Sequence, residues 1–394
     1  MNGASNESAD CVVVGAGVIG LSVALELLRH DVDVLVFERD DGRRGATRAA
    51  GGMLAPVSEA DTGRDALLEL GLDSLDRYPE WVSDIEKASG RRCGFRREGS
   101  LWIATDRDEA ELLDHVRETL RHKRLKAVPL EAAEVRRLEP HLSPRVVSGL
   151  GIESDRQVDP RQLATALAAA VIAGGGRVVH GHRVAAIEAA GGGLEIEGES
   201  PDGPFSFRCG RIVVCAGAWS ESGIRLPAPP RGLRPVKGQL VRLRGPVLLG
   251  RVVRTPHVYL IPRADGELLI GATLEEAGQD EQATAGAVME LLRRAWHALP
   301  GIYDLNFTEV SVGLRSAVAD NLPLIGESGT PGLYLAVGHY RNGILLAPAT
   351  AYYLARWIVD GAAPSELDPF APSRLAGLAP GVAAGARREE VGGG

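Results

Sequence analysis

Arg315 is the residue of this chain whose type and setting point most directly to chemistry. It ends the segment 308–315, whose alternating pattern predicts a strand. A guanidinium among apolar and small neighbours is costly unless it meets an anion, and its planar fork can bind a carboxylate through two parallel hydrogen bonds. We therefore expect Arg315 to bind the carboxylate of a small acid. The alternative is a structural salt bridge with an Asp or Glu side chain.

A second candidate site is the segment 338–346, which reads Gly-His-Tyr-Arg-Asn-Gly-Ile-Leu-Leu and contains Arg341. It follows a strand-like run, 333–337, and leads into an alanine-rich helix. Such a junction directs backbone N–H groups and the positive end of the helix at one point, which suits an electron-rich ligand atom. A turn of the same kind lies near residue 15, so we expect the two regions to close on one cofactor.

That N-terminal turn carries Gly15, Gly17 and Gly20 in the spacing Gly-x-Gly-x-x-Gly, and Glu38 lies eighteen positions after Gly20. The turn follows the β-branched run 11–14 and opens a helical pattern. In this context the glycines allow the backbone to approach a pyrophosphate, and the acid binds a ribose hydroxyl. Glu38 would repel a 2′-phosphate. The motif does not distinguish FAD from NAD, and a purely structural glycine turn is the weaker alternative.

The segment 45–56, Gly-Ala-Thr-Arg-Ala-Ala-Gly-Gly-Met-Leu-Ala-Pro, contains too many small residues for an ordinary helix surface. Small side chains here would let a bulky planar ring lie against the backbone. Close packing of a helix on a strand is the alternative.

The elements that position these residues are predicted from periodicity and turn residues. The N-terminal region forms a βαβ unit, which implies a right-handed crossover and a parallel sheet. The segment 64–124 has a helical pattern interrupted by a strand at 99–103, and 234–318 is rich in strands, with a hairpin turn at 263–266. The other expected elements are strands at 32–37, 177–180, 184–187, 211–214, 258–261 and 267–271, helices at 160–173, 283–299 and from the 338–346 turn to residue 359, and hairpin turns at 191–193 and 201–204.

This order predicts a discontinuous nucleotide-binding domain threaded through a second, antiparallel-sheet domain. We assign residues 1–80, 150–225 and 319–371 to the first domain, residues 81–149 and 226–318 to the second, and residues 372–394, rich in Gly, Ala and charge, to a disordered tail.

Composition excludes several classes of function. The net charge of −8 and the lack of a basic stripe argue against a nucleic-acid partner. The chain starts without a signal-peptide pattern, and its longest apolar run, 163–173, is too short to span a bilayer. The four cysteines form no CxxC pair, which is typical of reduced thiols in a cytoplasmic protein. His180 and His182 would share one side of a strand, and we expect a surface feature there and no metal site.

In the order and spacing of these motifs, the chain resembles the D-amino-acid oxidase superfamily of FAD-dependent amine oxidoreductases, and most of all the glycine oxidases of thiamine biosynthesis. The matching segments are 15–20 with Glu38 and Arg39, 47–56, 257–259, 262–266, 313–315, 320–326 and 338–346. They span almost the whole chain, and the last two are the most specific. The resemblance implies an α/β fold: an FAD-binding Rossmann-like domain of the glutathione-reductase type, with an inserted antiparallel-sheet α+β substrate domain.

The resemblance also implies that FAD is bound without a covalent bond. Relatives with covalent flavin attach it through a cysteine beside the Arg315 position, where this chain has Leu314 and Ser316. The family usually shows Ala-Thr-Gly where this chain has Cys-Ala-Gly at 215–217, and we expect the backbone contact to be retained. The residues implied to hold FAD are Gly15, Gly17, Val18, Ile19, Gly20, Glu38, Arg39, Ala46, Thr47, Gly51, Gly52, Met53, Val184, Ala216, Gly217, His339, Tyr340, Arg341, Asn342, Gly343, Ile344 and Leu345.

The resemblance also implies which residues form the substrate site, and these are Arg315, Arg341, Tyr259, His257, Ala55 and Pro56. Arg315 would grip the α-carboxylate, and Arg341 would share it or support the flavin. Tyr259 would donate a hydrogen bond to the substrate. His257 lies two positions earlier, so on a strand it shares the face of Tyr259 and would line the pocket. For an isolated tyrosine on a strand, plain packing is the alternative.

The implied activity is FAD-dependent oxidative deamination of glycine by molecular oxygen, which yields glyoxylate, ammonia and hydrogen peroxide and serves thiamine thiazole biosynthesis. Sarcosine and small D-amino acids are further candidate substrates, and we expect a homo-oligomer. One alternative is a D-amino-acid or imino-acid oxidase or dehydrogenase of broader specificity. Another is a catalytically silent FAD-binding subunit, which has no need of Arg315 and Tyr259. An NAD-dependent dehydrogenase is opposed by the 338–346 turn.

Overall fold

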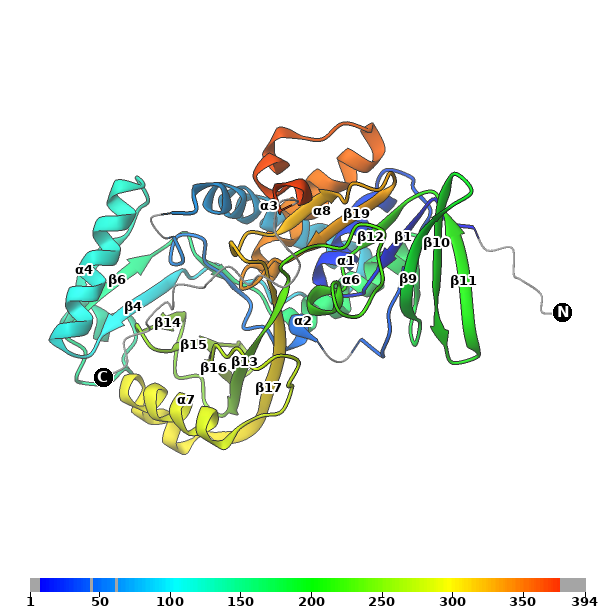
Figure 1. The fold of residues 1–394 in the computed structure, drawn as a ribbon. Helices are drawn as coiled ribbons and strands as arrows, with labels where there is room; N and C mark the ends of the chain where they lie inside the picture. The colour runs from blue at the N-terminus through cyan, green and yellow to red at the C-terminus, as the bar shows by residue number, and fades with distance from the viewer. Residues whose placement is uncertain (1–7, 43–44, 61–62, 376–394) are drawn as a thin grey trace.

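The computed structural model describes residues 8–42, 45–60 and 63–375, and its strands form sheets of six, eight, three and two strands. In Figure 1 the three-stranded sheet lies at one end of the molecule and the eight-stranded sheet with α7 (Ala285–Ala298) lies toward the other. The six-stranded sheet lies between them. This mixture of a mainly parallel sheet with largely antiparallel ones confirms the predicted α/β class.

The six-stranded sheet has the order β18-β19-β12-β1-β2-β8. Its strands are β1 (Cys11–Val14), β2 (Val34–Phe37), β8 (Arg177–Val179), β12 (Ile212–Val214), β18 (Leu324–Glu327) and β19 (Leu333–Val337). All neighbours are parallel except β18 and β19, and helix α1 (Val18–Leu28) joins β1 to β2, which confirms the βαβ prediction. Strand β2 begins two residues later than predicted, because the Val32 N–H donates to the carbonyl of Leu27 in the turn after α1.

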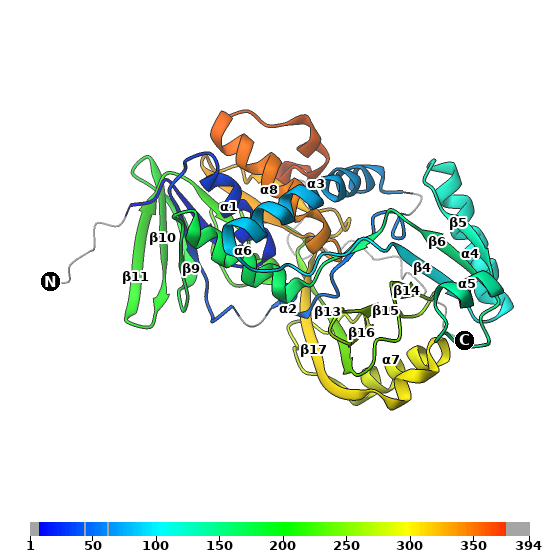
Figure 2. The ribbon, with the colours of Figure 1, turned by 180° about the vertical axis from the view of Figure 1, so that it is seen from behind.

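Strand β1 is buried on both faces, which explains why it reads as an unbroken apolar run. Cys11 and Val13 belong to a core shared with the helices, and Val12 and Val14 belong to a core shared with the three-stranded sheet. The helices of the first core are α1, α3 (Asp65–Ser89), α6 (Pro160–Ala173) and α8 (Gly343–Asp360). Figures 1 and 2 show these four helices grouped together, with α3 next to α8. Helix α6 has the predicted bounds.

The three-stranded sheet is an antiparallel meander of β9 (Arg183–Ala190), β10 (Gly193–Ser200) and β11 (Gly203–Cys209). Its two connections are the hairpin turns predicted from glycine and proline. It covers the face of the six-stranded sheet that the helices leave free.

The eight-stranded sheet has the order β17-β13-β16-β15-β14-β4-β6-β5. Its strands are β4 (Ser100–Ala104), β5 (Val128–Glu131), β6 (Ser148–Ile152), β13 (Arg234–Arg244), β14 (Val252–Arg254), β15 (Tyr259–Pro262), β16 (Glu267–Gly271) and β17 (Asn306–Ala317). Its neighbours are antiparallel except for β14 and β4, and β15 and β16 form the predicted hairpin. Helix α7 packs on this sheet, and α4 (Arg107–His122) and α5 (Ala132–Leu138) lie beside β4 and β5 (Figure 2). The division of the chain into two domains with the stated boundaries stays a prediction.

The predicted disordered tail is wrong at its start. Residues Pro372–Leu375 form a short 3-10 helix in which Leu375 is buried and Arg374 pairs with Asp320 at 2.9 Å. The rest of that segment, 376–394, lies outside the described residues. The remaining elements are α2 (Ala46–Ala49), β3 (Met53–Leu54), β7 (Arg156–Gln157) and 3-10 helices at Gly217–Trp219, Pro300–Asp304 and Ser365–Phe370.

Helix α8 starts at the predicted strand–turn–helix junction and contains Pro348, which cannot donate a backbone hydrogen bond to Ile344. Two side chains of α3 compensate. The Tyr78 hydroxyl donates to the Ile344 carbonyl at 2.5 Å, and the Ser74 hydroxyl donates to the Leu345 carbonyl at 2.6 Å. The first turn of α8 is therefore fixed to α3.

Within residues 8–42, 45–60 and 63–375, no helix is both long and apolar enough to cross a membrane. The four cysteines are free thiols, and three of them are buried.

Candidate active site

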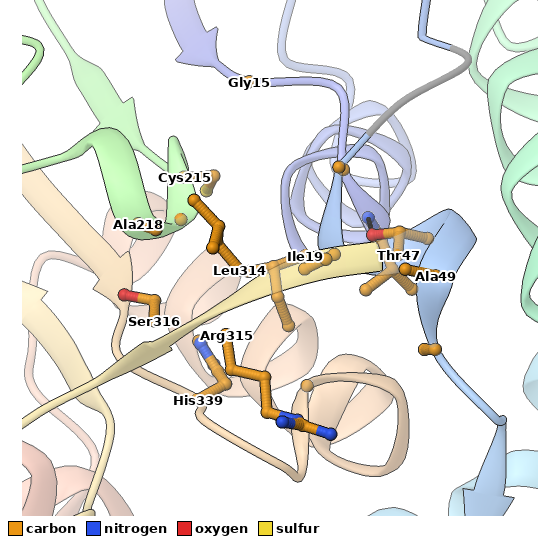
Figure 3. A pocket seen from close by; sticks show the side chains of 18 of the residues that line it. Gly15, Ile19, Thr47, Ala49, Cys215, Ala218, Leu314, Arg315, Ser316 and His339 are labelled. Carbon is orange, nitrogen blue, oxygen red and sulfur yellow. Dashed lines mark hydrogen bonds between the residues drawn. The ribbon is translucent and has the colours of Figure 1, made fainter. Parts of the chain in front are cut away.

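A cavity of about 390 Å³ lies where the six-stranded sheet, the segment 45–56 and the eight-stranded sheet meet. Most predicted site residues line it. They are Gly15, Gly17, Val18, Ile19, Glu38, Arg39, Ala46, Thr47, Gly51, Gly52, Met53, Ala55, Val184, Ala216, Gly217, Tyr259, Arg315, His339, Tyr340, Arg341, Asn342, Gly343 and Ile344. Figure 3 shows Gly15, Thr47 and Cys215 toward one part of this space and Arg315 and His339 toward another.

Three other predicted residues lie behind the cavity wall. A Cβ added at Gly20 would lie 1.9 Å from the carbonyl oxygen of Gly15, so this glycine lets α1 pack against the turn. Pro56 and Leu345 lie against Gly71 of α3, where an added Cβ would be 3.2 Å and 3.4 Å from their side chains. Their role in the structure is packing.

His257 is also absent from the cavity wall, and the prediction that it shares a face with Tyr259 is wrong. Strand β15 begins only at Tyr259, and His257 belongs to the turn before it. In that turn the backbone N–H of His257 donates to Thr255 Oγ1 at 3.1 Å. The imidazole Nε2 lies 3.7 Å from Glu109 Oε1 of α4, so the ring approaches that helix.

The N-terminal glycine turn has the geometry that a pyrophosphate requires. Gly15 has φ 107°, and a Cβ there would lie 2.7 Å from the carbonyl oxygen of Cys215, so only glycine fits. Glu38 Oε2 accepts the Ala16 N–H at 2.7 Å, and Thr47 Oγ1 accepts the Val18 N–H at 3.0 Å. Gly17, Val18 and Ile19 line the cavity, so the positive end of α1 faces it.

Next to this turn, three aromatic side chains that sequence reasoning did not assign to the site line the cavity: Phe37, His182 and Trp219. The Arg39 guanidinium lies 4.2 Å from the centre of the Trp219 ring, and the His182 ring stacks on Phe37 at 5.6 Å. Trp219 directly follows the small residues 216–218, so its place in the sequence was the available signal.

The expectation that His180 and His182 share one side of a strand is wrong. Gly181 between them has φ 74°, and neither β8 nor β9 includes these residues. His180 is exposed, with Nδ1 3.0 Å from the Asp40 carbonyl oxygen, whereas His182 turns toward Phe37 and the cavity.

The small residues of 45–56 serve close packing and also line the cavity. A Cβ at Gly51 would lie 2.6 Å from Ile261, and one at Gly52, where φ is 79°, would lie 2.1 Å from the Val158 carbonyl oxygen. The buried Arg263 donates to the Gly51 carbonyl at 2.6 Å and so fixes the segment to the β15–β16 hairpin. Both interpretations of this segment, close packing and a surface for a planar ring, therefore have support.

The turn before α8 is tied to the strand that carries Arg315, because the Tyr340 N–H donates to the Ser316 carbonyl at 2.8 Å. His339 is buried, and its Nε2 lies 3.1 Å from Thr350 Oγ1. Burial lowers the pKa of His339 to about 3, so the imidazole is neutral at ordinary pH. This part of the wall is therefore uncharged at His339.

Arg315 extends from β17 beside that turn (Figure 3) and is held by two carbonyls. Its Nη1 donates to Thr273 O at 3.1 Å and to Lys237 O at 3.4 Å. A Cβ at Gly238 would lie 2.3 Å from Arg315 Nη1, so the absence of a side chain there makes room for the guanidinium. Over the part of the chain that the structure describes, Arg315 forms no ion pair with an Asp or Glu, which removes the support for the salt-bridge alternative.

Arg341, by contrast, has a carboxylate partner. Glu59 Oε1 lies 3.5 Å from Arg341 Nη2 and 3.3 Å from Arg254 Nη1, and the Arg254 guanidinium lies 4.7 Å from the centre of the Trp102 ring. Burial alone would raise the pKa of Glu59, but the two guanidinium groups outweigh it and hold this pKa below its ordinary value. Sequence reasoning missed Glu59 and Arg254, whose meeting depends on the fold.

Tyr259 faces the same space, and burial raises the pKa of its hydroxyl above the ordinary value. A neutral tyrosine hydroxyl can donate a hydrogen bond. In residues 8–42, 45–60 and 63–375, no group of three or more His, Cys, Asp or Glu side chains could hold a metal ion. The arrangement can thus bind a dinucleotide at one end and an acid at the other.

The family described as "DAO: FAD dependent oxidoreductase" matches residues 10–357. A glycine oxidase from Geobacillus kaustophilus is 32% identical over 93% of this chain and 97% of that protein. The crystal structure of the glycine oxidase from this organism matches with a TM-score of 0.86 over 94% of this chain and 99% of that chain.

A bifunctional protein ThiO/ThiG from Nostoc sp. is 35% identical over 93% of this chain, and the match covers 55% of that protein. The present chain therefore spans about half the length of such bifunctional relatives. The crystal structure of iminodiacetate oxidase from Chelativorans sp. matches at 25% identity with a TM-score of 0.82, covering 92% of this chain and 98% of that chain.

Proposed function

We propose a function from the premise that this chain belongs to the DAO family of FAD dependent oxidoreductases. The protein oxidises glycine with molecular oxygen and produces glyoxylate, ammonia and hydrogen peroxide. The observation that supports this most is the Arg315 guanidinium, which lines the cavity and has carbonyl partners but, among the described residues, no carboxylate partner.

The residues present fit FAD. The N-terminal end of α1 with Gly15 and Gly17 suits the pyrophosphate, Glu38 suits a ribose hydroxyl, and the turn 339–344 with the segment 45–53 suits a flat ring system. Bound FAD would accept a hydride from the α-carbon of the substrate. Leu314 and Ser316 flank Arg315, so we propose that the cofactor is held without a covalent bond.

Arg315 would bind the substrate carboxylate through two parallel hydrogen bonds and so fix the position of the α-carbon. Because Thr273 and Lys237 contact it with neutral carbonyls, its charge remains available for an anion. Tyr259 would donate a hydrogen bond from its hydroxyl to the same carboxylate. Arg341 is paired with Glu59, and we therefore assign it a supporting role.

No side chain is required as a base in this scheme, because a neutral substrate amine supplies the electron pair that forms the imine. Water then hydrolyses the imine to the 2-oxo acid and ammonia. His339 is a poor candidate for a base, since its buried imidazole has a pKa of about 3 and lies against Thr350.

The name glycine oxidase of one relative supports glycine as substrate. The name of another, a putative thiamine biosynthesis oxidoreductase ThiO from Rhizobium etli, supports thiamine biosynthesis as the pathway, and we propose its thiazole branch. Sarcosine and small D-amino acids are further candidates, and the similarity to an iminodiacetate oxidase keeps a broader specificity as the second hypothesis. The homo-oligomeric state and the cytoplasmic location stay predictions.

The test is oxygen uptake by the purified yellow protein with glycine, sarcosine, D-alanine and D-proline, each compared with reduction of a dye. We expect uptake with glycine, together with equal amounts of hydrogen peroxide and ammonia. Dye reduction without oxygen uptake would indicate a dehydrogenase. Activity with D-proline but not glycine would favour the second hypothesis.

A further inference from the structure

The segment 272–284, which we call the strap, links β16 to α7 without regular secondary structure for most of its length and touches Arg315. Its residues from 276 to 284 are exposed. Thr273 at its start accepts a hydrogen bond from Arg315, and Glu281 near its end lines the cavity. The position of the strap therefore sets part of the surroundings of the guanidinium.

Two buried polar side chains of β13 hold this exposed strap. Gln239 is 0% exposed, accepts the Thr284 N–H at 3.0 Å and donates to Glu275 Oε1 at 2.8 Å. Lys237 is 1% exposed, and its Nζ lies 2.5 Å from Asp280 Oδ2 and 3.9 Å from Glu275 Oε2. A buried ammonium is expensive to desolvate and is retained only where it is paired.

Lys237 also connects the strap to Arg315 through its backbone. Its N–H donates to Glu275 O at 2.9 Å, and its carbonyl accepts both the Glu275 N–H at 3.0 Å and Arg315 Nη1 at 3.4 Å. One residue therefore holds the strap with its side chain, pairs with it through its backbone, and contacts the guanidinium.

We propose, in an inference that rests on the proposed function, that Lys237 and Asp280 are positioning residues for substrate binding. Their ion pair holds the strap against β13, and the strap in turn presents the Thr273 carbonyl that orients Arg315 toward the substrate carboxylate. Neither residue takes part in the bond-making steps. Loosening the pair should therefore weaken carboxylate binding and leave the chemical step almost unchanged.

The experiment compares Asp280→Asn with the unchanged protein, both as FAD-loaded enzyme. The Asp280 side chain is 45% exposed, so the variant should fold. We expect the Kd for acetate, measured by the change in the flavin absorption spectrum, and the KM for glycine to rise together by about tenfold, a factor equivalent to about 1.4 kcal/mol. We expect kcat and FAD content to stay within about twofold, a difference of less than about 0.5 kcal/mol.

Two further variants sharpen the comparison. Asp280→Glu keeps the charge and should recover most of the acetate affinity. Asp265→Asn is the matched control, because it removes a surface ion pair of 3.0 Å with Arg244 at the other end of β13. This control should bind acetate as the unchanged protein does.

Equal acetate affinity in Asp280→Asn and the unchanged protein would overturn the inference and leave the proposed function intact. A fall in kcat with unchanged KM would also overturn it. If the unchanged yellow protein neither responds to acetate nor oxidises glycine, the proposed function fails, and this inference fails with it.

Discussion

At the pyrophosphate end of the cavity, the glycine turn and its hydrogen-bond partners lie within 15–47, on one βαβ unit and the start of α2, and residues 182–184 and 215–219 complete the wall. At the Arg315 end, the contacting groups come from positions 59, 237, 238, 254, 259, 273, 315 and 341. The first end is built from local backbone geometry, and the second from side chains that meet only after folding. Substitutions at the first end should therefore change cofactor affinity, and substitutions at the second end should change substrate binding.

Among the variants, Arg315→Ala should show the largest difference between its effect on substrate binding and its effect on cofactor binding. Loss of a charge-assisted contact to a buried carboxylate costs about 2–5 kcal/mol, so kcat/KM for glycine should fall by about 30-fold to several thousandfold. The protein should stay yellow with its FAD affinity unchanged. Arg293→Ala, which removes an exposed cation paired with Glu290, is the control. Loss of FAD with normal kinetics of the remaining holoenzyme would mean that Arg315 belongs to the cofactor end.

Behind the substrate end, Asp155 offers a prediction on stability against pH. Its carboxylate accepts hydrogen bonds from Ser58 and Ser100, and its other oxygen has no partner among the described residues. Burial raises the pKa of Asp155 from 3.8 to about 6. The folded state therefore holds a proton that the unfolded state releases between these two pH values, and stability falls as pH rises through this window.

A folded-state pKa that lies about two above the unfolded-state pKa corresponds to a change of about 3 kcal/mol in the free energy of unfolding across this window. Below about pH 4, the thermal stability of Asp155→Asn and that of the unchanged protein should therefore depend on pH in nearly the same way. From about pH 4 to about pH 7, the variant should become more stable relative to the unchanged protein. The exposed Asp304→Asn is the matched control and should show no such trend. A constant difference between Asp155→Asn and the unchanged protein at all pH values would contradict the assignment.

At the cofactor end, Glu38→Gln removes the charge that accepts the Ala16 N–H and that we assign to a ribose hydroxyl. A hydrogen bond to a charged group contributes about 1.5–3 kcal/mol, so the Kd for FAD should rise by about tenfold to a hundredfold. FAD titration of the apoprotein by fluorescence quenching measures this. The KM for glycine of the loaded enzyme should not change, and a raised KM would break the separation of the two ends. Glu188→Gln, at an exposed pair with Arg225, serves as the control.

The smallest expected effect is that of Gly238→Ala. The added Cβ would lie within 2.5 Å of the Arg315 guanidinium, which is the mobile end of a long side chain, so the fold should survive while the guanidinium shifts. We expect the Kd for acetate to rise by about tenfold, equivalent to about 1.4 kcal/mol, with normal FAD content. Gly286→Ala, where a Cβ meets nothing within 4 Å, is the matched control. Unchanged acetate binding would show that Arg315 has freedom to adjust.

The same contrast explains what the sequence could predict. The glycine turn, Glu38 and the β15–β16 hairpin depend on local backbone rules, so their types and spacing were sufficient. The pairing of Glu59 with Arg254 and Arg341 joins residues nearly 200 and nearly 300 positions apart, and no local pattern announces it.

Errors of the sequence analysis also have local causes. His257 was placed on a strand that in fact begins at Tyr259, because the Thr255 side chain caps the preceding turn. The segment after residue 372 was judged by composition alone, although Leu375 is buried and Arg374 pairs with Asp320. Average composition does not reveal such contacts, which also include a hydrogen bond from Arg374 to the Leu322 carbonyl at 2.8 Å.

The most direct test of the central claim is the visible spectrum of the purified protein before and after glycine is added without oxygen. If the cavity holds FAD beside a carboxylate bound by Arg315, the yellow absorption should bleach with glycine, return when oxygen is admitted, and bleach far more slowly in Arg315→Ala. A spectrum that glycine leaves unchanged at high concentration, although dithionite bleaches it, would contradict the proposed function.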